Sequence, residues 1–189
     1  MMNIVVYCGA NAGKDPAFAE AAKKLGQWIC DQGHTLVFGG GKVGLMGIIA
    51  DTVRAGGQKT IGVMPTFLIE RELAHPQLNQ LIVVDTMHER KLKMIELGDV
   101  YIALPGGWGT LEEFSEVISW SRIGQHNNPC ILVNTHNFYG GLVTQFKDMV
   151  TAGFLMQVEL ESLLVSDSIE QFQPFIDAHQ GLSAVTYTR

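Results

Sequence analysis

Short apolar runs rich in β-branched residues recur along this chain and alternate with longer segments of helical period. That alternation is typical of a parallel sheet covered by helices on both faces. It predicts strands at 3–8, 35–38, 60–64, 80–84, 100–104, 130–134 and 163–165. It predicts helices at 17–32, 44–56, 86–97, 111–123, 139–152 and 168–179. We therefore expect an α/β fold, a Rossmann-like doubly wound parallel sheet of about seven strands.

Length and composition favour one domain over residues 1–189. No linker divides the 189 residues, and 47% of them are hydrophobic. A formal net charge of −6, with no lysine or arginine run, argues against binding to nucleic acid or to an anionic membrane. No apolar run approaches the length of about 20 residues that a membrane span needs, and the start lacks a signal peptide. We expect a soluble, unprocessed protein.

Three scattered cysteines bear on redox chemistry and on metals. Cys8, Cys30 and Cys130 include no CxxC pair, which argues against a zinc site or a disulfide framework and fits a reducing cytoplasm. His75 and His88 lack an HxH or HExxH partner, so we expect structural hydrogen bonds from them and no bound metal.

The loops that follow strands hold the candidate functional residues, because ligands of doubly wound sheets bind beyond the carboxyl ends of the strands. The segment GGGKVG at 39–44 fits G-x-G-x-x-G. A dinucleotide fold would place this motif after the first strand and an acidic residue about 20 residues later, where Met64 and Pro65 stand. A nicotinamide-dependent oxidoreductase is therefore an alternative, and glycines that allow close helix packing are another.

The loop PGGWGTLEE at 105–113 gives a sharper signal. Gly106, Gly107 and Gly109 leave backbone N–H groups bare at the start of a helix that we expect Thr110 to begin, and such a start can hold a phosphate. The same residues also fit a T-x-x-E capping box, in which Glu113 bonds to the Thr110 amide. A capping box needs neither three glycines nor Trp108 between them, so the excess favours phosphate.

Basic residues begin the helix predicted after Asp85. His88, Arg90 and Lys91 stand where the helix dipole disfavours cations. Arg90 could face the crevice beside the glycine loop, since arginine suits phosphate or carboxylate partners. The alternative is a solvated basic turn paired with Glu89 and Glu96.

Together, the segments GGGKVGLMG (39–47), MHERK (87–91) and PGGWGTLEE (105–113) closely resemble the Lonely Guy family. Its members are cytokinin riboside 5′-monophosphate phosphoribohydrolases, and an older label for the family is lysine decarboxylase. The similarity covers about residues 3–155. The short chain resembles the dimeric branch of the family.

The resemblance implies hydrolysis of a nucleoside 5′-monophosphate, a cytokinin riboside 5′-monophosphate or AMP, to the free base and ribose 5-phosphate, without a cofactor. It places the 5′-phosphate on Gly106, Gly107, Gly109 and Thr110, with Trp108 as another substrate-binding residue, and the catalytic pair at Arg90 and Glu113. It suggests further substrate contacts at Glu72, Lys91 and Ser119. Ala10-Asn11 stand where many members have Ser-Ser, which puts a hydroxyl contact from the first loop in doubt. Trp108 stands where many members have tyrosine.

The chemistry agrees with this resemblance. Breaking an N-glycosidic bond builds positive charge at C1′, which carboxylates stabilise while they activate water. Lysine decarboxylation would need a pyridoxal lysine, and no lysine stands out for it, so we consider the older label misleading. A nucleotide-binding or carrier protein without turnover stays the rival hypothesis, beside the oxidoreductase.

Overall fold

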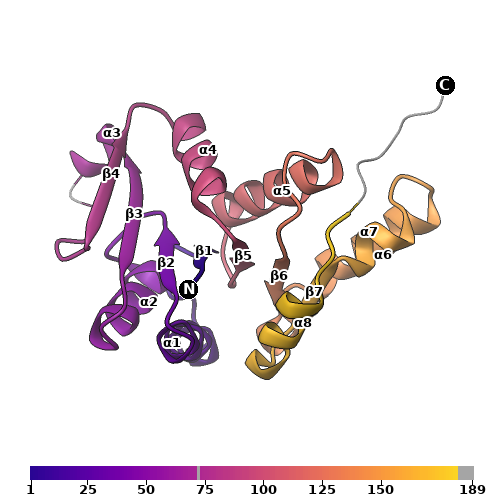
Figure 1. Cartoon of the computed structure of the whole chain (residues 1–189), viewed down its shortest axis with the longest axis horizontal. Coiled ribbons are helices and arrows are strands. Elements are labelled where there is room, and N and C mark those ends of the chain that lie inside the picture. The colour runs from indigo at the N-terminus through magenta and orange to yellow at the C-terminus, as the bar shows by residue number, and fades with distance from the viewer. Residues whose placement is uncertain (72, 183–189) are drawn as a thin grey trace.

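The computed structural model describes residues 1–71 and 73–182 and is built around a seven-stranded sheet (Figure 1). The strand order is β4-β3-β2-β1-β5-β6-β7, and the paired strands all run parallel. The α/β doubly wound architecture predicted from the sequence is thereby confirmed.

The strands lie close to the predicted segments. They are β1 (Asn3–Tyr7), β2 (Thr35–Phe38), β3 (Thr60–Pro65), β4 (Gln80–Val84), β5 (Val100–Ala103), β6 (Cys130–Val133) and β7 (Leu163–Ser166). The helices are α1 (Pro16–Asp31), α2 (Gly44–Ala55), α3 (Thr66–Ile69), α4 (Met87–Leu97), α5 (Trp108–Arg122), α6 (Gly140–Thr151), α7 (Gln157–Glu161) and α8 (Phe172–Ala178). Two 3₁₀ turns, η1 (Thr135–Asn137) and η2 (Ile169–Gln171), complete the described elements.

Alternate residues of each central strand enter two separate cores. In β1, Ile4 and Val6 pack with α1, α2 and α8, whereas Val5 and Tyr7 pack with α4, α5 and α6. Figure 1 shows the same two layers, with α4 and α5 above the sheet edge and α1, α2 and α8 below it. Burial on both faces explains why the strands are apolar throughout and do not alternate.

The direction of winding reverses between β1 and β5. From β1 the chain adds β2, β3 and β4 on one side, and then returns to add β5, β6 and β7 on the other. The loops after β1 and β5 therefore diverge at this point and leave a crevice, which is where ligands of such sheets bind.

A few predicted elements need correction. The helix expected at 111–123 begins earlier, at Trp108, and the helix expected at 168–179 is a 3₁₀ turn followed by α8. The short helices α3 and α7 are not predicted from the sequence, because they are too brief to show a helical period. No helix within residues 1–71 and 73–182 is long and apolar enough to cross a membrane.

Candidate active site

A cavity of about 400 Å³ lies at the switch point between β1 and β5. The loop after β1 and the loop after β5 form two of its walls, and they are joined where the Gly9 amide donates to the Pro105 carbonyl at 3.1 Å. Helices α2, α4 and α5 add further side chains to the lining. The site therefore occupies the position that the sheet topology favours for a ligand.

The start of α5 forms one wall of this cavity. Gly107 is its N-cap, and no side chain of the described residues caps the helix there. The first N–H groups of an α-helix have no partner inside the helix, and the helix dipole places positive charge beside them. Gly106, Gly107, Gly109 and Thr110 line the cavity, so these amides lie at its edge.

Two of the three glycines face open space. A Cβ at Gly106 would come within 2.6 Å of the Thr110 Cβ, so this glycine permits close packing inside the loop. A Cβ at Gly107 or at Gly109 would meet no protein atom within 4 Å. Internal packing therefore does not account for these two glycines, whereas close approach of an anion to their backbone would.

The capping-box interpretation of Glu113 is wrong. Because α5 begins at Trp108, Thr110 is already the third helical residue and does not occupy the N-cap position. The Glu113 carboxylate points to the arginine of α4, and its Oε1 lies 3.2 Å from Arg90 Nη1.

Arg90 and Glu113 form a buried ion pair that lines the cavity. Their side chains are only 10% and 9% exposed. Arg90 Nε also donates to the Val63 carbonyl at 3.1 Å, which orients the guanidinium at the end of β3. A Cβ at Gly39 would lie 1.9 Å from Arg90 Nη2, so this glycine leaves room for the arginine.

The ion pair controls the protonation of its carboxylate. Burial raises the pKa of Glu113 above its usual value, because water no longer solvates the charged form. The neighbouring Arg90 guanidinium opposes this rise, and Glu112 adds a smaller upward effect on the same pKa. Arg90 therefore favours the ionised form of the carboxylate, against the effect of burial.

The alternative interpretation of Arg90 and Lys91, as part of a solvated basic turn, is wrong as well. Arg90 is buried against Glu113, and Glu89 instead accepts from the Asp85 amide at 3.0 Å. Lys91 is buried and pairs with Glu112 and with Glu116, outside the cavity lining. Its charge also lowers the pKa of Glu113, and its partner Glu112 does line the cavity.

Two other predicted site residues are not brought to the cavity, and a third cannot be placed. Trp108 is 90% exposed and is not among the lining residues. Ser119 lies on a different face of α5, beside a second cavity formed with α6 and α7. Glu72 lies outside the described residues.

The sequence analysis did not identify the apolar lining of the site. Phe18 from α1 and Phe138 after η1 line the cavity and meet edge to face, with ring centroids 5.4 Å apart. Met46 from α2 and Met87 from α4 line it too. In the sequence, Phe18 falls in the apolar stripe of the helix predicted at 17–32, and nothing in the pattern around Phe138 marks it as a site residue.

The loop at 39–44 follows β2 and not β1, which does not fit the dinucleotide motif. Its glycines permit close packing: Gly44 has φ +61°, and a Cβ there would lie 2.3 Å from the Ala10 carbonyl carbon. Within the described part of the chain, no three His, Cys, Asp or Glu side chains form a group that could hold a metal ion.

Solved structures with the same fold share little sequence with this chain. The molybdenum cofactor carrier protein of Chlamydomonas reinhardtii matches with a TM-score of 0.70 at 18% identity, over 93% of this chain and 98% of that one. The molybdenum cofactor binding protein of Rippkaea orientalis matches with a TM-score of 0.67 at 21% identity, over 94% and 97% of the two chains. At such identities the likeness supports the fold alone.

Sequence relatives are much closer. The cytokinin riboside 5′-monophosphate phosphoribohydrolase of Rhodococcoides fascians is 40% identical over 89% of this chain and 85% of its own length. An Arabidopsis thaliana protein of the same name is 37% identical over 92% and 83% of the two lengths. A family profile described as "Possible lysine decarboxylase" matches residues 46–174. This chain therefore belongs to the Lonely Guy family, the phosphoribohydrolases for which that older description is still used.

Proposed function

We propose that the protein hydrolyses the N-glycosidic bond of a nucleoside 5′-monophosphate, either a cytokinin riboside 5′-monophosphate or AMP. Water adds to C1′, the bond from C1′ to the base nitrogen breaks, and that nitrogen receives a proton. The products are the free base and ribose 5-phosphate. The names of the relatives at 37% and 40% identity support this activity.

One observation carries the proposal: the buried pair of Arg90 and Glu113 lines the same cavity as the uncapped start of α5. The helix start provides amides and positive potential for a 5′-phosphate. The ion pair provides a carboxylate within one small ligand's length of that phosphate. A site built only to bind a nucleotide has no need of a buried carboxylate beside an anion site.

The carboxylate fits the demands of the reaction. As the base leaves, C1′ and the ring oxygen become positively charged, and a fixed anion close to them stabilises that charge. In its ionised form, Glu113 can do this and can also accept a proton from the attacking water. Arg90 favours the ionised form of Glu113, against the effect of burial, and holds its carboxylate in place.

The apolar walls of the cavity suit the base of the nucleotide. Phe18, Phe138, Met46 and Met87 give the cavity an apolar surface, against which a flat ring or an N6-prenyl chain buries well. Gly106, Gly107, Gly109 and Thr110 then hold the phosphate. The predicted contact of Glu72 with the nucleoside stays a prediction, and we assign Lys91, Trp108 and Ser119 no direct contact.

The experiment is a side-by-side incubation of the protein with AMP and with an N6-prenylated AMP, followed by chromatography for the free base and for ribose 5-phosphate. Both products should form in equal amounts, and they should form far more slowly with Glu113→Gln. Tight binding of either nucleotide without release of base would support the carrier hypothesis instead. Fluorescence titration with NADH tests the oxidoreductase.

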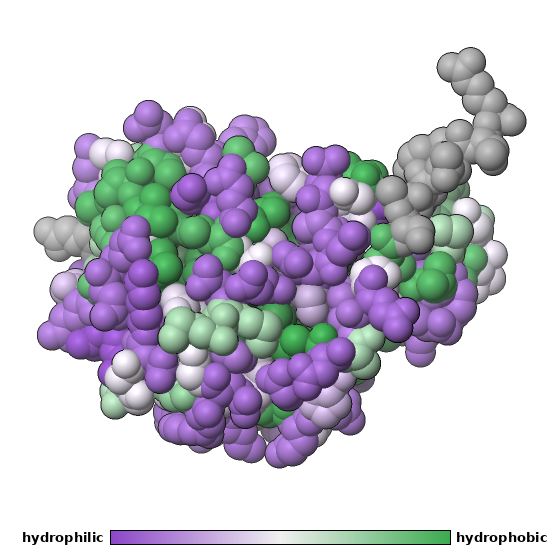
Figure 2. Space-filling view, viewed as in Figure 1, coloured by the Kyte–Doolittle hydropathy of each residue, from purple (hydrophilic) through white to green (hydrophobic). Residues whose placement is uncertain are grey.

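We also propose a homodimer in the cytoplasm. An apolar patch lies over α3, β4 and α4 (Figure 2), and the exposed large apolar residues of these elements are Phe67, Val83, Met87 and Leu92. An isologous pair through α4 and α5 would cover part of this patch. Sedimentation should return about twice the chain mass of 20.7 kDa. A fully active species at the chain mass would refute the dimer.

A further inference from the structure

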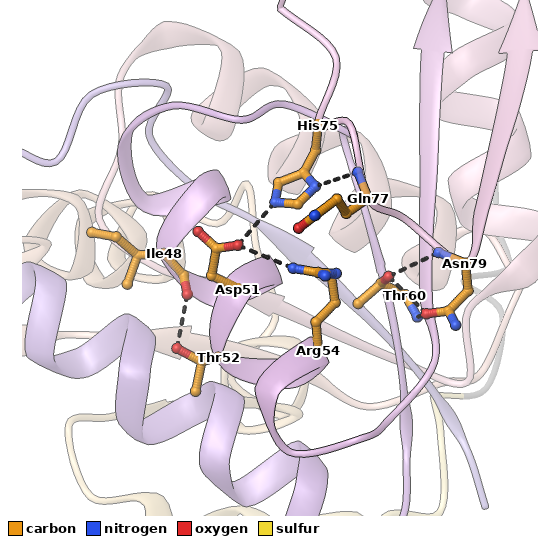
Figure 3. A network of polar contacts seen from close by, with 8 residues as sticks. All are labelled: Ile48, Asp51, Thr52, Arg54, Thr60, His75, Gln77 and Asn79. Carbon is orange, nitrogen blue, oxygen red and sulfur yellow. Dashed lines mark hydrogen bonds and ion pairs between the residues drawn. The ribbon is translucent and has the colours of Figure 1, made fainter.

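A polar network on α2 holds the loop between α3 and β4. His75 is 7% exposed, and its Nε2 lies 3.1 Å from Asp51 Oδ1 of α2 (Figure 3). Arg54, one turn further along α2, reaches the same oxygen at 3.4 Å. At the far end of the loop, Asn79 Oδ1 accepts from the Thr60 amide at 2.8 Å. The loop is therefore fixed at two separate points.

The bonds of His75 define the state of its ring. The Gln77 amide lies 3.2 Å from Nδ1, and a backbone N–H can only donate, so Nδ1 is the acceptor. The ring proton therefore lies on Nε2, which donates to Asp51. Both ring nitrogens are engaged, and the imidazole joins the loop to α2 in one orientation.

The residues beside His75 are bonded to the glycine loop of the active site. We name residues 73–75 the strap and residues 39–42 the glycine loop. The His75 amide donates to the Gly40 carbonyl at 2.8 Å, and the Lys42 amide donates to the Leu73 carbonyl at 3.0 Å. Between these two bonds, Gly41 and Ala74 form an antiparallel bridge. The strap thus acts as a short added strand along the glycine loop.

The glycine loop in turn limits where Arg90 can lie. Gly39 lines the cavity, and its Cα is so close to the Arg90 guanidinium that a Cβ there would lie 1.9 Å from Nη2. A shift of the glycine loop of about 1 Å would therefore displace the guanidinium or leave it unsupported. Misplacement of that size costs roughly 10²-fold in rate when it affects groups that must be aligned for reaction.

We propose that His75 is a positioning residue for the reaction. Through Asp51 it holds the strap against α2, the strap holds the glycine loop, and the glycine loop fixes the wall against which Arg90 lies. This inference rests on the proposed function, because it assigns to His75 an effect on the turnover in which Arg90 takes part. The phosphate site at the start of α5 belongs to a different wall and is unaffected.

The test compares His75→Leu with His75→Gln and Arg54→Ala by kcat and KM on the substrate that the wild type hydrolyses. His75→Leu loses both ring bonds, and its kcat should fall roughly 10- to 100-fold with KM within about 3-fold. His75→Gln keeps a donor for Asp51 and should recover kcat to within about 5-fold of wild type. Arg54→Ala is the matched control, because Arg54 shares the Asp51 oxygen from within α2. It should leave kcat unchanged.

Hydrogen exchange gives a readout that does not need activity. The Lys42 amide bonds to the strap, so it should lose protection in His75→Leu and keep it in Arg54→Ala. If the wild type releases no base, the proposed function fails, while the exchange of this amide still decides whether the network holds the glycine loop.

The kinetic results of the variants either support or overturn the role of His75. Wild-type kcat in a folded His75→Leu protein overturns the proposal, and so does an equal loss in Arg54→Ala. Failure of His75→Gln to recover kcat also overturns it, because the Asp51 bond would then not be the one that matters. If His75→Leu does not fold, Asp51→Ala decides, since Asp51 is 67% exposed and its loss leaves no buried gap. A kcat loss supports the proposal, and wild-type kcat refutes it.

Discussion

The contact between Gly39 and Arg90 allows a sharp test of the active site, because one added methyl group reaches the arginine without changing any charged residue. In Gly39→Ala the new Cβ would stand 1.9 Å from Arg90 Nη2, whereas ordinary contact begins at about 3.4 Å. The guanidinium must therefore retreat by about 1.5 Å. Its bond to the Val63 carbonyl (3.1 Å) and its pairing with Glu113 (3.2 Å) cannot both survive such a shift.

We expect the protein to fold and to turn over slowly. Gly39 is not among the glycines with positive φ, so alanine fits its backbone, and the obstructed atom is the end of a flexible side chain. The value of kcat should fall roughly 100-fold, as expected for a misplacement of more than 1 Å in a reacting pair. Competition by ribose 5-phosphate should change less than about 3-fold, since the start of α5 is untouched.

The assay is steady-state release of free base, with ribose 5-phosphate as competitor and thermal unfolding as the check of folding. Gly141→Ala is the matched control: a Cβ there meets nothing within 4 Å, and Gly141 lies on α6, away from the cavity. It should leave both kinetic constants unchanged. A folded Gly39→Ala protein with wild-type kcat would show that the position of Arg90 does not limit the reaction.

Four further predictions concern the ion pair and the phosphate. Glu113→Gln should lower kcat by about two to four orders of magnitude in a folded protein, and activity within a few-fold of wild type would remove the carboxylate from the mechanism. Arg90→Lys should be nearly as damaging as Arg90→Ala, because an ammonium lacks the planar fork of a guanidinium. In Arg90→Ala the pKa of Glu113 should rise further, because the opposing charge is gone. As the pH falls, any residual activity should therefore be lost at a higher pH than in the wild type. An acidic limb of the pH profile at the wild-type position would contradict this. Adenosine should be a poor substrate and inorganic phosphate a competitor, and equal kcat/KM for adenosine and AMP would rule out a phosphate site.

The sequence predicts the sheet well because burial on both faces leaves an unambiguous pattern. Strands such as β2 and β5 are four apolar or buried residues each, set between long helical segments, and few other folds tolerate that order. Short helices leave no such pattern in the sequence: α3 has four residues and α7 has five, which is too few to show a helical period.

The sequence indicates which residues are candidates for the site, but it does not determine where their side chains point. Whether Glu113 caps a helix or meets Arg90 depends on where α5 begins, and a shift of three residues reverses the answer. Trp108 stands among site glycines in sequence, yet as the first helical residue it projects into solvent. Ser119 follows Glu113 by six residues, which is about 240° around a helix and so a different face.

Phe138 could not be placed at the cavity from the sequence for a different reason. It follows His136 and Asn137, which have φ of +51° and +59°, and this pair of left-handed residues turns the chain back toward α1. The His136 Nδ1 also lies 2.8 Å from Asp15 at the start of α1, which holds the turn there. No periodic pattern encodes such a turn, so its aromatic side chain could be found at the cavity only from the structure.

The absence of a side-chain cap on α5 among the described residues affects how this scaffold can change over evolution. A phosphate held by main-chain amides survives most point mutations, because nearly every residue type keeps the same N–H group. In the mechanism that we propose, turnover depends on two side chains, Arg90 and Glu113, and a single base change in either codon can remove it. A gene of this kind can therefore pass from encoding a hydrolase to encoding a nucleotide-binding protein in one step, with its affinity for phosphorylated ligands largely inherited.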